Sequence, residues 1–228
     1  METIEINEAD GQTLGHLPQG RLPVQLVIRP QTSELPDYRG YAGKISSGSF
    51  QVGEAVTVLP SGESSTIARI EASGLGGEPH DVPEAHVNQS VILHLTNNID
   101  VSRGDLIVPS VGQPLLSQDV EAMLCWMDTK TLTIGNKYVL QVGTSQTRCS
   151  VRAIPYQLNI ETYEPIEGID TLHLNDLARV VLRTAQPIAF DPYGRNRANG
   201  GAILIDETSN VTVGALMLKG KGGPGLLR

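Results

Sequence analysis

The side chains of this 228-residue chain best suited to acid–base or metal chemistry are its five histidines, and they are scattered. His80 and His86 share a stretch with Asp81 and Glu84, and imidazole and carboxylate groups are both zinc ligands. Metal sites favour closely spaced ligands on rigid elements, so we interpret this stretch as a solvated acidic loop and assign no metal ligand. His94 lies in an alternating run, which predicts a packed or hydrogen-bonded strand residue instead of a catalytic base.

Nucleophilic side chains are no better placed for covalent catalysis. The sequence has no Gly-x-Ser-x-Gly elbow, the turn that exposes a catalytic serine in many hydrolases. Its two cysteines, Cys125 and Cys149, form no Cys-x-x-Cys pair and have no nearby cluster of metal ligands. We predict that both are buried, reduced thiols. The sequence therefore yields no catalytic residue.

One polar loop contains residues that could contact a partner molecule. Arg195 and Arg197 flank Asn196 shortly before Gly200. Guanidinium groups bind carboxylates and phosphates, and functional residues are common on loops, so Arg195, Asn196 and Arg197 are our candidate contacts. The alternative is that these loop arginines are ordinary solvated charges.

The charge is distributed unevenly along the chain. Residues 1–114 carry six basic and fourteen acidic side chains, whereas residues 115–228 carry eleven of each. Nucleic-acid binding depends on cations that neutralise phosphates, and it usually gives a protein a basic face. The acidic first half therefore argues against a nucleic-acid partner.

The elements that must position these residues are predicted to be strands. Glycine (24) and proline (14) are plentiful, and short runs alternate between apolar and polar residues, as expected for many short strands joined by turns. A polar loop is expected at 79–83, and a short helical turn is plausible only at 170–176. The predicted fold class is all-β, with two consecutive small β-barrels. The predicted strands are 22–29, 39–47, 54–59, 64–74, 90–96 and 105–109 in the first half, and 120–126, 138–142, 147–160, 177–185, 202–205 and 211–218 in the second.

Turn-rich clusters divide the chain into four predicted segments. Residues 1–20 form a linker or the end of an upstream domain, 21–113 the first barrel, 114–219 the second barrel, and 220–228 a flexible tail. No run approaches the ~18 apolar residues of a membrane-spanning helix. Residues 1–5 are acidic where a signal peptide would be basic. We therefore expect a cytoplasmic protein that does not interact with membranes.

Two adjoining motifs relate the first barrel to a known family. The pattern Gly-x-x-Gly-x-Ile-x-Ser-Gly spans residues 40–48, and Val-Gly-Glu-x-Val-x-Val-Leu-Pro-Ser-Gly spans 52–62. Together they resemble the second domain of translation-factor GTPases, a small β-barrel that follows the nucleotide-binding domain. Within this family, the sequence most resembles one branch, the large regulatory subunit (subunit 1) of bacterial sulfate adenylyltransferase. This closer likeness is carried by residues 23–25, residues 29–30 and the ending of the second motif.

The carboxyl-terminal part resembles the last domain of the same branch, again a β-barrel. The likeness is carried by residues 190–196, 200–206 and 209–215. Pro192 stands where the family usually has arginine, so no contact of that arginine carries over to this chain. Leu216 stands where the family usually has glycine, which predicts a locally repacked strand end.

The resemblance implies that the parent protein hydrolyses GTP, yet the motifs for that reaction are missing here. A phosphate-binding loop reads G-x-x-x-x-G-K-[ST], and residues 214–222 have one residue too many and end in glycine. Residues 136–139 approach the guanine-reading Asn-Lys-x-Asp but lack the aspartate. Asp-x-x-Gly occurs at 37–40 and 191–194, about as often as chance predicts. We expect this chain alone to be inactive and to bind no cofactor, with GTP and magnesium held by a domain that is not in this sequence.

The resemblance spans about residues 20–219 and implies a function. The chain would be the non-catalytic two-barrel portion of a GTP-dependent regulatory subunit of sulfate adenylyltransferase, which makes adenylyl sulfate and pyrophosphate from ATP and sulfate in sulfate assimilation. Its expected partners are the GTPase domain of the same parent protein and the small catalytic subunit. Two alternatives stay open: a translation-factor fragment that binds aminoacyl-tRNA, and a free-standing β-barrel adaptor.

Overall fold

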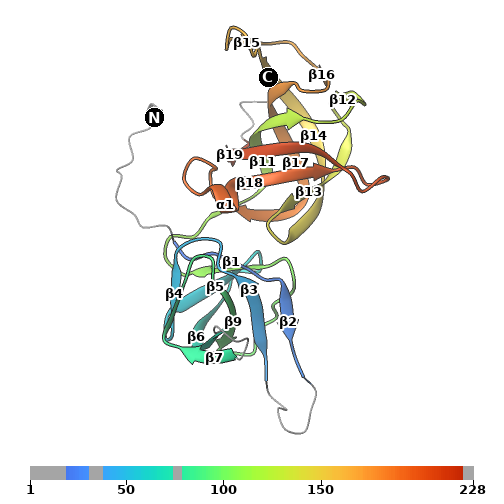
Figure 1. The fold of residues 1–228 in the computed structure, drawn as a ribbon. Coiled ribbons are helices and arrows are strands. Elements are labelled where there is room, and N and C mark those ends of the chain that lie inside the picture. Colours follow the sequence, from blue (N-terminus) through green and yellow to red (C-terminus); the bar gives the residue numbers. More distant parts are fainter. Residues whose placement is uncertain (1–18, 31–37, 74–78, 223–228) are drawn as a thin grey trace.

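Strands make up nearly all the regular structure of this protein (Figure 1). The computed structural model describes residues 19–30, 38–73 and 79–222; most of the predicted linker, residues 31–37 and 74–78, and the end of the predicted tail lie outside these ranges. Within them the one helix is α1 (Arg197–Gly200), a single turn. The prediction of an all-β fold with two consecutive barrels is confirmed.

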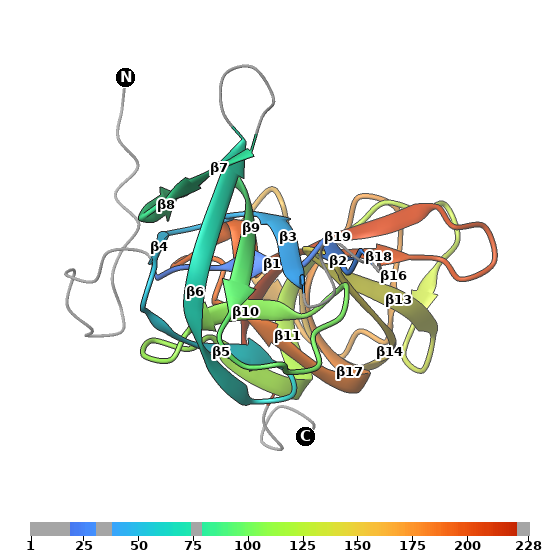
Figure 2. The same cartoon turned by 90° about the horizontal axis from the view of Figure 1, so that it is seen from below.

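The first barrel is closed by one stretch of chain that changes partner halfway. β1 pairs with β10, and β2, which follows in the same stretch, pairs with β3. The strand order β1-β10-β5-β6-β9-β3-β2 thus returns to its starting segment (Figure 2). β7 pairs with β6 beside this ring, and β4 pairs with β8 as a separate two-stranded ribbon. The strands are β1 (Leu22–Pro23), β2 (Leu26–Ile28), β3 (Gly40–Lys44), β4 (Ser49–Gln51), β5 (Ala55–Leu59), β6 (Glu63–Ser73), β7 (Pro79–Val82), β8 (Glu84–His86), β9 (Ser90–Leu95) and β10 (Leu106–Pro109).

The second barrel is a closed ring of six strands. Its order is β13-β18-β19-β11-β17-β14, and the pairing of β13 with β14 completes the ring. β15 continues the sheet from β14, and β12 pairs with β16 as a separate ribbon. The strands are β11 (Leu115–Trp126), β12 (Leu132–Thr133), β13 (Lys137–Val142), β14 (Ser145–Leu158), β15 (Pro165–Ile166), β16 (Thr171–Leu172), β17 (Leu177–Phe190), β18 (Gly201–Ile205) and β19 (Thr212–Lys221).

Period-two alternation explains the cores of both barrels. Along β11, Val120, Ala122, Leu124 and Trp126 all point inward and are essentially inaccessible to solvent. The indole N–H of Trp126 donates to a backbone carbonyl at 2.8 Å, so this buried polar group is satisfied. Leu216, where the family usually has glycine, is buried in the same core in the middle of β19 and not at a strand end.

Steric crowding explains why position 43, in the first motif, is a glycine. A Cβ atom at Gly43 would lie 2.5 Å from the carbonyl oxygen of Pro23, on the neighbouring stretch that closes the barrel. Any side chain would push β3 away from this stretch. The glycine is therefore required by close packing of two backbones.

Two local predictions are wrong. The stretch 79–83 is not a loop, because β7 pairs with the exposed edge of the long strand β6. The stretch 170–176 contains strand β16 instead of a helical turn, since Leu172 pairs with Leu132 and both are fully buried. The only helical turn among the described residues lies at α1, where the side chain of Asn196 caps the amino-terminal end.

The two cysteines differ in exposure, so only half of the prediction for them holds. Cys149 is buried, as expected, and burial raises its pKa from 9.0 to about 12. Cys125 is partly exposed on the outer face of β11. Because only the thiolate reacts with thiol reagents, a pKa of about 12 leaves roughly a thousand-fold less thiolate at pH 8 than a pKa of 9.0.

We predict that a maleimide at pH 8 modifies Cys125 alone in the native chain and modifies Cys149 only after unfolding. Mass spectrometry of tryptic peptides at timed intervals measures both reactions, and the Cys125→Ser variant is the control. Rapid native labelling of Cys149 would contradict the packing of β13 against β14.

Candidate functional site

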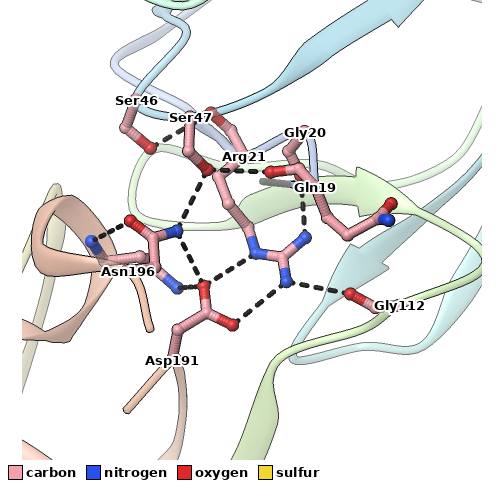
Figure 3. A network of polar contacts seen from close by, with 9 residues as sticks. Gln19, Gly20, Arg21, Ser46, Ser47, Gly112, Asp191 and Asn196 are labelled. Atoms are coloured by element: carbon pink, nitrogen blue, oxygen red, sulfur yellow. Dashed lines mark hydrogen bonds and ion pairs between the residues drawn. The ribbon is translucent and has the colours of Figure 1, made fainter. Parts of the chain in front are cut away.

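The junction of the two barrels is built around Arg21, which immediately precedes β1 (Figure 3). Its guanidinium donates from Nε to Oδ2 of Asp191 and from Nη2 to Oδ1, each at 3.0 Å. The same group donates to the carbonyl oxygens of Gly20 and Gly112, each at 2.9 Å. Arg21 therefore joins its own barrel, the connection between the barrels, and the loop that follows β17.

Asp191 receives further donors from its own domain. The side-chain amides of Asn196 and Asn199 each donate to Asp191 Oδ2 at 3.0 Å. Asn196 also donates to the hydroxyl of Ser47 in the first barrel at 3.0 Å, and that hydroxyl donates to the carbonyl oxygen of Gln19 at 2.8 Å. Both oxygens of the Asp191 carboxylate thus accept hydrogen bonds. Two side-chain contacts cross the junction, Arg21 with Asp191 and Asn196 with Ser47.

Burial makes this ion pair energetically different from an exposed pair such as Arg183–Asp119. The side chains of Arg21 and Asp191 are 4% and 13% exposed, whereas those of the Arg183–Asp119 pair are both 42% exposed. Exposed pairs contribute little, but a buried charge that loses its partner is strongly destabilising. The bidentate geometry also fixes orientation, because both oxygens of Asp191 must face the guanidinium. The junction can therefore hold the two barrels in one arrangement.

A second polar cluster lies in the wall of the first barrel, around Glu71 and His94. His94 Nε2 is 2.7 Å from Glu71 Oε1, and its Nδ1–H donates to the carbonyl oxygen of Arg39 at 3.0 Å. The hydroxyl of Tyr38 donates to the same carboxylate at 3.2 Å, and burial followed by the Glu71 charge raises its pKa. Arg69 pairs with Glu71 as well. The prediction that His94 is a hydrogen-bonded wall residue is confirmed.

Beside this cluster the first barrel has an open cavity of about 640 Å³. Arg29 and Arg39 line it together with Tyr38, Tyr41 and two asparagines, Asn97 and Asn98. These groups can bind a polar or anionic ligand, and His94 and Thr96 also line the cavity.

The loop residues proposed from sequence have different surroundings. Asn196 faces the junction and bonds Ser47 and Asp191, so it serves contact between the barrels. Arg197 is exposed, with its guanidinium 5.9 Å from the ring centre of Tyr193. Arg195 is exposed as well. A role for this loop in binding an external partner stays a prediction.

Sequence reasoning missed the residues at the centre of the junction, Arg21 and Asp191. Asp191 lies inside the Phe190–Asn196 motif and begins the Asp-x-x-Gly match at 191–194, but neither signal points to a contact with Arg21. His80 and His86 lie on β7 and β8 and are exposed. Across residues 19–30, 38–73 and 79–222, no three His, Cys, Asp or Glu side chains are grouped as metal ligands. In the same ranges no helix has the length and apolar character needed to cross a membrane.

Comparison with known proteins gives the family of the chain. The family described as GTP-eEF1A C-terminal domain-like matches residues 119–219. Sulfate adenylyltransferase subunit 1 of Shewanella oneidensis is 39% identical over 223 residues, which is 96% of this chain and 43% of that protein. The bifunctional enzyme CysN/CysC of Mycobacterium tuberculosis is 40% identical over 199 residues, or 87% of this chain and 32% of that enzyme. This chain is homologous to the carboxyl-terminal region of sulfate adenylyltransferase subunit 1.

The homology to subunit 1 confirms the resemblance inferred from the motifs, and the chain spans less than half the length of these relatives. The fold itself is shared with more distant proteins. The crystal structure of sup35 complexed with GDP matches 90% of this chain and 48% of its own, with a TM-score of 0.77 at 15% identity. At that identity the match shows the two-barrel fold alone.

Proposed function

We propose that this chain is a non-catalytic scaffold of sulfate adenylyltransferase, which docks the GTPase domain of its parent protein and the small catalytic subunit. Synthesis of adenylyl sulfate from ATP and sulfate takes place on the small subunit, and GTP with magnesium is bound by the GTPase domain. The two barrels transmit the nucleotide state by moving as one body. The observation that carries this proposal is the buried Arg21–Asp191 pair, which joins the barrels.

Two of the partial GTPase motifs lie in places that disfavour nucleotide binding. The nearest match to a phosphate loop, residues 214–222, lies almost entirely within strand β19, whose backbone groups pair with β11 and β18. A phosphate loop needs free backbone N–H groups that converge on the ligand. Asn136 uses its side-chain oxygen to accept the backbone N–H of Thr133 at 2.8 Å, which closes a turn. These placements favour a scaffold over an enzyme.

We predict that isothermal titration of this chain with GTP or with ATP and magnesium gives no binding at micromolar concentrations. The small subunit from the same organism should bind the chain in the same instrument. Filter binding with aminoacyl-tRNA at low salt tests the translation-factor alternative, and the acidic first barrel should retain none. Micromolar binding of GTP or ATP, or failure of the small subunit to bind, would contradict the proposed function.

A further inference from the structure

An apolar stripe crosses the outer face of the second barrel, where a barrel in water normally presents polar side chains. Strand registers place its members side by side: Ile203 opposes Ala215, and Ala215 opposes Cys125. In the next row, Met217 opposes Met123. Ala215 and Met217 are exposed, and the other three are partly exposed. Figure 1 shows the three strands involved, β18, β19 and β11, in the second barrel, and their pairing makes them neighbours.

Four of the five residues of the stripe, all but Met123, line a groove of about 540 Å³. Glycine and alanine residues make much of its surface, including Gly201 and Ala215, so a partner can approach the sheet closely. Gly143 and Tyr193 line the end of the groove near the junction, and Cys125 lines it farther along β11. Methionine side chains adapt to different partner surfaces, and a contiguous exposed apolar surface in a soluble protein usually marks an interaction site.

The border of the stripe is basic, in contrast to the acidic first half of the chain. Arg179 opposes Met123, and Arg148 opposes Val139, which neighbours Ile205 at the edge of the stripe. Lys219 is exposed two residues beyond Met217, and Arg197 lies over Tyr193. Two of these four cations are paired with carboxylates, Arg179 with Glu121 and Arg148 with Glu207. The charge that complements this border is negative.

We propose that this groove is the surface on which the small catalytic subunit docks, through a segment with apolar side chains at its centre and carboxylates at its edges. This inference rests on the proposed function and adds the location of the contact. Complementary charge selects the partner and speeds association, while burial of the methionines and Ile203 provides affinity. The groove begins at the junction, so its occupant contacts a region whose geometry depends on how the barrels are oriented.

The test uses the complete chain and the small subunit from the same organism. Met217→Glu places a negative charge in the apolar stripe at an exposed position, so the barrel should still fold. We expect its dissociation constant for the small subunit to rise at least about ten-fold, since a charge buried at the interface would lack a partner. Val52→Glu, at an apolar position of the first barrel that is 45% exposed against 38% for Met217, is the matched control and should bind like the native chain. Circular dichroism and thermal melting of both variants verify that they fold.

Cys125 provides an independent readout of the same contact. Saturating small subunit should slow maleimide labelling of Cys125 at least about ten-fold in the native chain, and should slow it less in Met217→Glu. Equal binding by Met217→Glu and Val52→Glu, with Cys125 unprotected, would overturn the groove assignment while leaving the proposed function intact. Loss of all binding by the native chain would overturn both. Protection of Cys125 by the parent GTPase domain, and not by the small subunit, would also overturn the assignment.

Discussion

Replacing Arg21 with alanine is expected to lower the free energy of unfolding by about 3 kcal/mol, because the buried carboxylate of Asp191 loses its ionic partner. The two barrels have separate hydrophobic cores, so loss of the junction should also split one cooperative thermal transition into two. Differential scanning calorimetry measures both effects. Arg21→Lys keeps the charge but not the two parallel hydrogen bonds, and its effect should be intermediate.

The control for Arg21 is another arginine in an ion pair. Arg183→Ala removes a pair whose two side chains are both 42% exposed, and it should cost no more than about 1 kcal/mol. A native-like melting curve for Arg21→Ala would mean that the junction does not hold the barrels together.

The second large effect is expected from Gly200→Ala. A Cβ atom at Gly200 would lie 2.5 Å from the Cα of Tyr193 and 2.7 Å from the carbonyl oxygen of Asp191, so backbone must move. The loop that presents Asp191 to Arg21 would shift with it. We expect a loss of about 1–3 kcal/mol in unfolding free energy, as for other overpacked sites, and a weaker junction.

Gly194→Ala is the matched control for Gly200, because it lies in the same loop and its added Cβ would meet no atom within 4 Å. Alanine there should be neutral or slightly stabilising. Urea denaturation of the two variants compares them directly. Equal stability of Gly200→Ala and Gly194→Ala would contradict the tight packing of the Asp191 loop.

The strands that form the barrels could be predicted because their signal is local. Alternation along 120–126 identified the inward face of β11, and all twelve predicted strands have a counterpart. The ribbons β4–β8 and β12–β16 were missed, since strands of two or three residues contain too few positions to show a period. They exist because their partners, far away in sequence, provide the pairing.

The junction could not be predicted for a related reason. Arg21 and Asp191 are separated by 170 positions, and each looks like an ordinary charge in a polar turn. Its residue type and loop position predict that Asn196 contacts an external molecule, whereas in the structure its side chain caps α1 and donates to Ser47. The homology relates the chain to the carboxyl-terminal region of sulfate adenylyltransferase subunit 1, and the structure explains why the motif contains these residues.

The most direct test of the account is the distance between the two barrels in solution. Spin labels at Val52→Cys and Val211→Cys, both exposed positions on different barrels, can be introduced with Cys125 changed to serine and measured by double electron–electron resonance. If the Arg21–Asp191 junction holds the barrels as one body, the distance distribution is narrow with a single maximum and broadens on Asp191→Ala. A broad distribution in the otherwise native chain would contradict the claim that the barrels form one rigid scaffold.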